Sequence, residues 1–152
     1  MELIANFVQI NDRLGTAGQP TIEQFTAIRD AGYTVVINLA VPTSEGAVTQ
    51  ACAKGIANER EIVESLGMQY FHIPVVWDNP TIEDFNQFSN VMQTHSDQSV
   101  FVHCAKNMRV SAFVYLYRRS HENISEEEAR ADLNKIWQPN PTWQMLMKTV
   151  LG

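Results

Sequence analysis

A cysteine and an arginine separated by four residues stand where an apolar strand-like run meets an apolar helix-like run. The run Val100-Phe101-Val102 leads through His103 into Cys104, and Arg109 begins the second run. These patterns predict a strand ending near Cys104 and a buried helix over 110–121. Such a turn directs backbone N–H groups, the positive end of a helix dipole and the Arg109 guanidinium at one small volume beside a thiol. That volume suits a bound oxyanion and favours the nucleophilic thiolate.

This loop resembles the active-site loop of the cysteine-dependent phosphatases, the protein-tyrosine and dual-specificity superfamily. Their signature is His-Cys, five residues, Arg, and then Ser or Thr. Here only four residues separate Cys104 from Arg109, and Val110 stands at the hydroxyl position with Ser111 one place later. The loop glycine of the family, three residues after the cysteine, corresponds to Asn107. Asparagine is the non-glycine residue that best tolerates positive φ, so the left-handed turn can be kept.

The four-residue spacing also keeps two other hypotheses open. Rhodanese-type sulfurtransferases resemble this loop in having a Cys, four residues, and then Arg or Thr, and they carry a persulfide on a similar strand-to-helix turn. Alternatively, the chain is a non-catalytic pseudophosphatase that binds phosphate or another anion. The pseudophosphatase alternative arises because the loop between Cys104 and Arg109 is one residue shorter than in the phosphatases. It is therefore shorter by one Cα step of ~3.8 Å and offers one fewer N–H group to a phosphate.

The phosphatase resemblance implies a role for each residue of the loop. Cys104 is the expected nucleophile, and Ser111 is expected to hydrogen-bond the Cys104 sulfur and assist its departure. His103 is expected to orient the loop rather than to transfer a proton. The expected phosphate-binding residues are Ala105, Lys106, Asn107, Met108, Arg109 and Val110.

Asp78 is the expected general acid. It follows the strand-like run 69–75, in the segment Trp77-Asp78-Asn79-Pro80, whereas Cys104 follows the next strand along the chain. Parallel strands place their carboxyl ends, and therefore their ligands, at one edge of a sheet. The segment resembles the acid loop of the dual-specificity phosphatases, and protonation of the leaving oxygen requires such a group. The alternative is that Asp78 only forms an Asx-turn before Pro80. Rhodaneses need no acid here.

Composition limits the class of protein. With 152 residues, 45% hydrophobic and 18% charged, the chain fits one globular domain spanning 1–152. Its net charge of −6 argues against a general nucleic-acid or anionic-membrane surface. No apolar run reaches membrane-spanning length and no basic leader segment opens the chain, so we expect a cytoplasmic location. Cys52 and Cys104 lack metal-site or disulfide-framework spacing, and we expect neither metal nor cofactor.

The periodicity predicts alternating strands and helices. Strands are expected at 7–11, 13–19, 34–39, 69–75 and 100–103. Helices are expected at 22–31, 82–92, 110–121, 126–136 and 142–150, with one interrupted or two short helices over 45–66. Thr21 with Gln24, and Thr81 before an apolar helix face, are N-terminal capping signals. Within the interrupted helix, Cys52 is either a small buried side chain or a redox partner of Cys104.

Two shorter motifs resemble a bacterial β-lactamase-hydrolase-like branch of the dual-specificity phosphatases. Gly18-Gln19-Pro20 precedes an amphipathic helix, and Asn38-Leu39 ends an apolar strand. In that branch an arginine commonly follows; here the position holds Ala40, so any substrate contact of that arginine is lost or moved.

The predicted fold class is α/β. We expect a three-layer sandwich in which a mostly parallel sheet of four or five strands has helices on both faces, similar to the protein-tyrosine phosphatases. The expected function is hydrolysis of phosphate monoesters through a cysteinyl-phosphate intermediate. The expected substrate is a phosphorylated small molecule or a phosphoprotein, and neither its identity nor the oligomeric state follows from the sequence.

Overall fold

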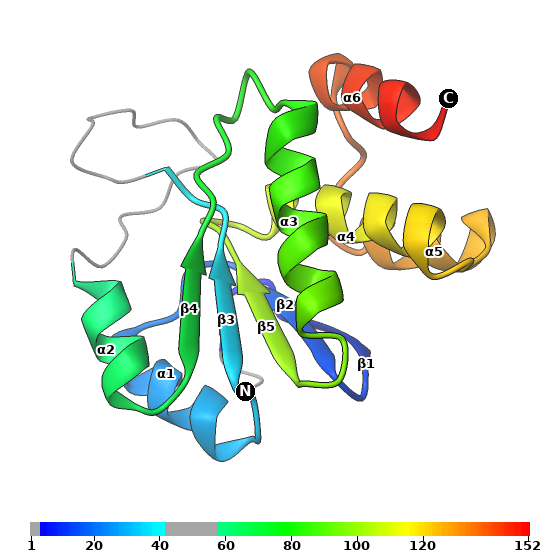
Figure 1. Cartoon of the computed structure of the whole chain (residues 1–152). Coiled ribbons are helices and arrows are strands. Elements are labelled where there is room, and N and C mark those ends of the chain that lie inside the picture. Colours follow the sequence, from blue (N-terminus) through cyan, green and yellow to red (C-terminus); the bar gives the residue numbers. More distant parts are fainter. Residues whose placement is uncertain (1–3, 42–57) are drawn as a thin grey trace.

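Five short strands form one sheet in a computed structural model that describes residues 4–41 and 58–152 (Figure 1). The strands are β1 (Val8–Asn11), β2 (Leu14–Ala17), β3 (Val35–Asn38), β4 (Gln69–His72) and β5 (Val100–His103). Their order across the sheet is β1-β2-β5-β3-β4. Strands β2, β5, β3 and β4 are parallel to their neighbours, and only β1 is antiparallel, to β2. The strand that leads to Cys104 is therefore the central one.

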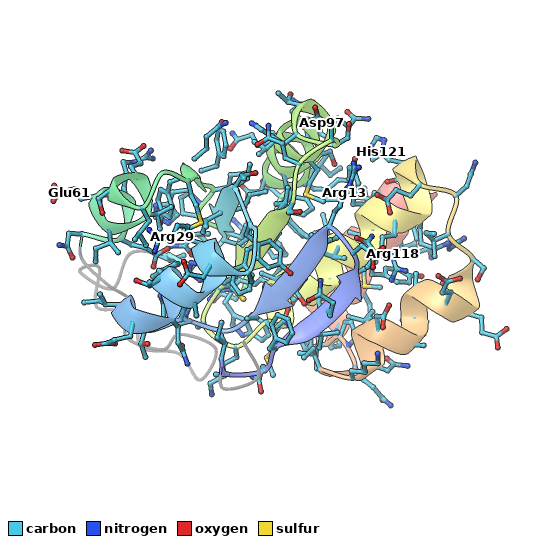
Figure 2. The ribbon with its side chains drawn as sticks, turned by 90° about the horizontal axis from the view of Figure 1, so that it is seen from below. Arg13, Arg29, Glu61, Asp97, Arg118 and His121 are labelled. Atoms are coloured by element: carbon cyan, nitrogen blue, oxygen red, sulfur yellow. The ribbon has the colours of Figure 1, made fainter. Side chains whose placement is uncertain are left out.

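Six helices within the described ranges cover the two faces of this sheet. They are α1 (Ile22–Asp30), α2 (Glu59–Ser65), α3 (Ile82–Thr94), α4 (Met108–His121), α5 (Glu126–Asn134) and α6 (Pro141–Leu151). Helices α1 and α2 lie on one face and α3 to α6 on the other, and the view from below separates α1 from α3 across the sheet (Figure 2). The three-layer α/β architecture predicted from the sequence is confirmed.

The alternation of side chains along the strands divides the core in two. Val36 and Phe101 pack with the α1–α2 layer, whereas their neighbours Val35, Ile37 and Val102 pack with the layer of α3 to α6. Strands β3 and β5 are buried on both faces along their whole length, which explains why their sequences read as continuous apolar runs. Helix α4 lies inside the larger layer, with residues 109–118 all buried.

The predicted helix caps are present. Thr21 and Thr81 each form a capping box, with Gln24 and Asp84 respectively. Ser125 accepts a hydrogen bond from the Glu128 N–H at the start of α5. Each cap satisfies donors that a helix N-terminus leaves without an intrahelical partner.

Most elements differ from their predicted bounds by one or two residues at an end, and two of these differences bear on the site. Strand β4 ends at His72 rather than at residue 75, and the segment that follows contains Pro74, which has no N–H to donate. Helix α4 begins at Met108, two residues before the predicted start, so that Arg109 lies in its first turn. Cys52 and residues 45–57 of the interrupted helix lie outside the described residues; α2 is its described part. No helix in the described ranges is long and apolar enough to cross a membrane.

Candidate active site

Cys104 lies at the carboxyl end of the central strand. Its N–H donates to the Ala17 carbonyl of β2 at 3.3 Å, and the carbonyl of His103 accepts from the Leu39 N–H at 2.8 Å. The two neighbouring strands therefore fix the backbone on both sides of the cysteine. Its side chain is buried, with 1% of its surface exposed.

The loop after Cys104 has its carbonyl groups bound to the surrounding structure. The Ala105 carbonyl accepts from the Gln19 N–H at 3.0 Å, and the Lys106 carbonyl accepts from Asn6 Nδ2 at 3.0 Å. The Cys104 carbonyl lies 3.4 Å from His103 Nδ1. In a trans peptide the C=O and N–H point in opposite directions. Hence the N–H groups of residues 105 and 106 point away from these partners, which is the arrangement that a bound anion requires.

Asn107 takes the left-handed conformation at the start of α4, with φ of 67°. Its Nδ2 donates to the Asn6 carbonyl at 2.8 Å and to Thr16 Oγ1 at 3.1 Å. The side chain thus contributes contacts that a glycine could not make. The first intrahelical bond is from the Ser111 N–H to the Asn107 carbonyl, at 2.8 Å. The N–H groups of residues 108–110 precede that bond and point toward the N-terminal end of the helix.

Gly18 allows the loop to approach β2 closely. An added Cβ at this position would lie 2.6 Å from the Ala105 oxygen and 3.1 Å from the Ala5 oxygen. Both contacts are with backbone atoms, which cannot rotate away. The glycine of the Gly-Gln-Pro motif is therefore a requirement of this close approach.

Arg109 is fully buried at the base of the loop. Its guanidinium donates from Nη1 to the Val75 carbonyl at 3.0 Å. Val75 lies three residues before Asp78, so this bond connects the cysteine loop with the segment that carries the predicted acid. The guanidinium offers five donors in a planar fork, a geometry that matches phosphate oxygens.

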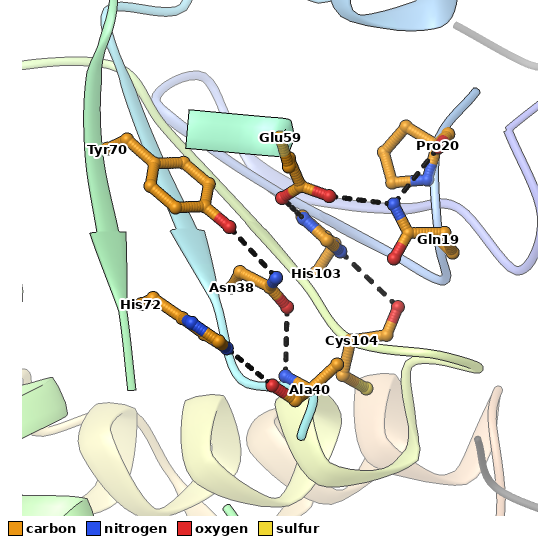
Figure 3. Close-up of polar contacts among 9 residues, drawn as sticks. All are labelled: Gln19, Pro20, Asn38, Ala40, Glu59, Tyr70, His72, His103 and Cys104. Carbon is orange, nitrogen blue, oxygen red and sulfur yellow. Dashed lines mark hydrogen bonds and ion pairs between the residues drawn. The ribbon is translucent and has the colours of Figure 1, made fainter. Parts of the chain in front are cut away.

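Behind Cys104, a buried carboxylate holds the preceding histidine (Figure 3). His103 Nε2 lies 2.6 Å from Glu59 Oε2, and the two side chains are 0% and 4% exposed. Gln19 Nε2 donates to the other carboxylate oxygen at 2.9 Å. Both ring nitrogens of His103 therefore face oxygen atoms, the Glu59 carboxylate at Nε2 and the Cys104 carbonyl at Nδ1. The role of His103 in orienting the loop stays a prediction, and these contacts are compatible with it.

The network determines the charge state of Glu59. Burial favours its protonated form, but the electrostatic interaction with His103, together with hydrogen bonds from His103, Gln19 and Tyr70, lowers the pKa of Glu59 below its ordinary value. Burial and the nearby Glu59 charge raise the pKa of Tyr70. Asn38 completes the network by donating to the Tyr70 hydroxyl at 3.0 Å and accepting from the Ala40 N–H at 2.8 Å. Glu59 is thus a carboxylate and Tyr70 a neutral phenol.

The remaining predicted residues differ in exposure and in their contacts. Asp78 is exposed on the loop between β4 and α3, and Lys106 is exposed on the cysteine loop. The Ser111 hydroxyl donates to the Met108 carbonyl at 2.9 Å and accepts from Trp137 Nε1 at 3.1 Å. Since a hydroxyl has one proton, Ser111 must change rotamer before it can donate to the Cys104 sulfur. His72 lies 2.6 Å from the Ala40 carbonyl through Nε2, consistent with a structural role.

Glu59 and Tyr70 were missed as site residues. Glu59 lies among other acids of a helix with an exposed face, and nothing in the spacing distinguishes it from them. The described residues contain no group of three or more His, Cys, Asp or Glu side chains arranged to hold a metal ion.

Comparisons with known proteins agree with this architecture. A family model described as "DSP-PTPase phosphatase fused to NAD+ Kinase" matches residues 6–144. The "Beta-lactamase hydrolase-like protein" of Xylella fastidiosa is 31% identical over 124 residues, which are 82% of this chain and 27% of that protein. The chain therefore spans about a quarter of the length of this curated relative.

Solved structures share the fold over nearly the whole chain. A "Putative phosphatase (DUF442)" from Shewanella putrefaciens CN-32 has a TM-score of 0.81 at 33% identity, covering 98% of this chain and 93% of that one. PTPMT1 in complex with PI(5)P has a TM-score of 0.75 at 16% identity, covering 95% and 94%. The second likeness concerns the fold alone.

Proposed function

The chain belongs to the family of dual-specificity and protein-tyrosine phosphatase domains described by the matching model, and from this premise we propose that it hydrolyses phosphate monoesters through Cys104. The observation that carries the proposal is the loop itself. Cys104 directly follows the central strand, the carbonyls of residues 104–106 contact neighbouring groups, and helix α4 begins at Met108. In this proposal the N–H groups of residues 105–110 form a cradle for a phosphate beside the thiol.

In the first step the Cys104 thiolate attacks phosphorus. The S–P bond forms while the bond from phosphorus to the ester oxygen breaks, and its electron pair leaves with that oxygen. The N–H groups of residues 105–110 and the Arg109 guanidinium hold the phosphate oxygens as charge shifts onto them. Exposed Lys106 adds a positive charge at the rim. Asp78 donates a proton to the leaving oxygen, which departs as an alcohol.

In the second step water cleaves the cysteinyl-phosphate. Asp78, now a carboxylate, takes the proton from the attacking water, and the S–P bond breaks to return the thiolate and release inorganic phosphate. Ser111 stabilises the departing sulfur after its hydroxyl turns from Met108. His103, held by Glu59, positions the Cys104 carbonyl and hence the first peptide of the cradle.

The substrate class is a phosphorylated small molecule or a phosphoprotein. Recognition in this proposal depends on the dianionic phosphate group, because the cradle is built from backbone donors and one buried guanidinium. The PI(5)P of PTPMT1 is a ligand of that protein, and the phosphate monoester is the chemistry that it shares with our proposal.

Steady-state hydrolysis of p-nitrophenyl phosphate from pH 5 to 8 tests the proposal. We expect turnover by the wild type and its loss in Cys104→Ser, because serine is not ionised at these pH values. With phenyl phosphate, an ester with a poor leaving group, Asp78→Asn is expected to lower kcat/KM by about 10²-fold or more. General acid catalysis contributes a factor of about 10² to 10⁴ to the rate.

The same preparation distinguishes the alternatives. A sulfurtransferase would form a persulfide on Cys104 from thiosulfate, transfer it to cyanide, and remain active in Asp78→Asn. A pseudophosphatase would show no turnover, whereas inorganic phosphate would raise its melting temperature by binding the folded state. Either result would contradict the phosphatase proposal.

A further inference from the structure

Three tryptophans meet at the loop that carries Asp78, one from the loop itself and two from the segment that spans the end of α5 and the start of α6. Trp77 directly precedes Asp78, Trp137 follows α5, and Trp143 lies in α6. The ring centroids of Trp77 and Trp137 are 5.1 Å apart, those of Trp77 and Trp143 are 5.9 Å apart, and those of Trp137 and Trp143 are 6.1 Å apart. These three residues are called the tryptophan cluster below.

Hydrogen bonds from the indoles of Trp137 and Trp143 connect the cluster with other parts of the chain. Trp143, which is fully buried, donates from Nε1 to the Trp77 carbonyl at 2.8 Å. Trp137 donates from Nε1 to Ser111 Oγ, in the first turn of α4, at 3.1 Å. The cluster therefore connects the Asp78 loop both with α6 and with the helix that follows the cysteine loop.

Asp78 itself is exposed and lies on a turn closed by the bond from the Asn79 N–H to the Val76 carbonyl, at 3.1 Å. A single turn of this kind does not fix the direction of an exposed side chain, because short loops fluctuate when little apolar surface holds them. The contacts of the preceding residue, Trp77, restrain the loop more strongly. The half-buried Trp77 ring packs on the indoles of Trp137 and Trp143, and the Trp77 backbone carbonyl accepts a hydrogen bond from Trp143.

We propose that Trp143 and Trp137 are positioning residues that hold the Asp78 loop in register with the cysteine loop. This inference rests on the proposed function, in which Asp78 protonates the leaving oxygen. A misplacement of about 1 Å is enough to reduce such a transfer by about 10²-fold. The C-terminal part of the chain thereby contributes to proton transfer without touching the substrate.

Trp143→Phe tests the inference, because it keeps an aromatic ring in the core and removes the N–H donor to the Trp77 carbonyl. Phe88→Leu is the matched control. Phe88 is fully buried in the same core layer, and its aromatic contacts are with Phe113 and Tyr117 rather than with the cluster. Trp137→Phe is a second variant at a half-buried position, in case Trp143→Phe does not fold.

The first readout is amide hydrogen exchange of peptides covering residues 76–81, which requires no enzymatic activity. We expect exchange there to become roughly three- to tenfold faster in Trp143→Phe, the factor given by the loss of one hydrogen bond, and to stay unchanged in Phe88→Leu. Unchanged exchange in both tryptophan variants would overturn the inference even if the protein is an active phosphatase.

The second readout compares two aryl phosphates. Phenyl phosphate has a poor leaving group and needs the acid, whereas p-nitrophenyl phosphate does not. We expect Trp143→Phe to lower kcat/KM for phenyl phosphate by about tenfold or more and for p-nitrophenyl phosphate by less than about threefold. An equal fall for both esters would contradict a role in proton transfer. Absence of turnover in the wild type would instead refute the proposed function, and the exchange result would then decide the structural part alone.

Discussion

At the scale of single residues, the buried pair of Glu59 and His103 is the feature with the clearest physical signature. Both side chains are buried, and each is satisfied by the other and by neighbouring polar groups. Removing one partner from such a pair costs stability, because the remaining group stays buried without its counter-charge. The pair therefore couples the stability of the protein to pH.

The sign of this coupling follows from the lowered pKa of Glu59. Below pH 4.5, the ordinary pKa of a glutamate, Glu59 of the unfolded chain binds a proton. Glu59 of the folded protein stays ionised until a lower pH. The stabilisation is thus fully present above about pH 5 and is lost as pH falls through the lower pKa of the folded state. We expect Glu59→Gln to reduce the free energy of unfolding by roughly 1–3 kcal/mol at pH 7, and this deficit to shrink below pH 4.5.

Urea unfolding of wild type and variant between pH 7 and 3.5 measures this difference. Glu64→Gln is the control, because Glu64 is an exposed acid of the same helix and pairs with exposed Arg60. A deficit for Glu59→Gln that stays constant over the whole range would show that Glu59 does not carry the charge inferred for it.

At the scale of elements, the contact between β2 and the cysteine loop determines the shape of the phosphate cradle. Gly18 leads out of β2, and its N–H donates to the Ala5 carbonyl at 2.7 Å while Ala105 passes beside it. Because the neighbouring atoms belong to the backbone, a methyl group at this position must displace the loop. A displaced loop changes the direction of the N–H groups that we assign to phosphate binding.

Gly18→Ala is expected to lower kcat/KM for p-nitrophenyl phosphate by about tenfold or more, because small displacements at the reacting centre have large effects on rate. Gly67→Ala provides the comparison. Gly67 has φ of 87° and no heavy atom within 4 Å of an added Cβ, so the substitution costs stability through backbone strain without any contact with the loop. Kinetics and thermal unfolding of both variants separate the two effects. Equal losses of activity at equal losses of stability would contradict the assignment.

At the scale of the whole molecule, the architecture was largely predictable because strong local signals agree with one another. The apolar runs that became β3 and β5 are buried on both faces, and the capping boxes at Thr21 and Thr81 begin helices at the predicted residues. Asn107 was predicted to take the left-handed conformation that the shortened loop needs, and its φ of 67° agrees.

The parts that could not be predicted depend on tertiary contacts. Burial of Glu59 follows from the approach of α2 to the end of β5, which no local pattern encodes. The hydrogen bonds of Ser111 depend on Trp137, 26 positions along the chain. The tryptophan cluster joins Trp77 to two tryptophans that lie at least 60 positions further along the chain, Trp137 and Trp143. In each case the sequence shows which chemical groups a residue has, but it does not show which residue they contact in the folded protein.

The central claim is that Cys104 is a phosphate-accepting nucleophile, and trapping the intermediate tests it most directly. The Asp78→Asn variant is mixed with p-nitrophenyl phosphate, whose leaving group needs little acid assistance, and is quenched in acid within the first turnovers. Because the asparagine side chain of this variant cannot take a proton from water, the cysteinyl-phosphate should accumulate. We expect mass spectrometry to find phosphate on the peptide that contains Cys104, and none in the Cys104→Ser variant. Turnover of the ester without phosphate on Cys104 would contradict the account.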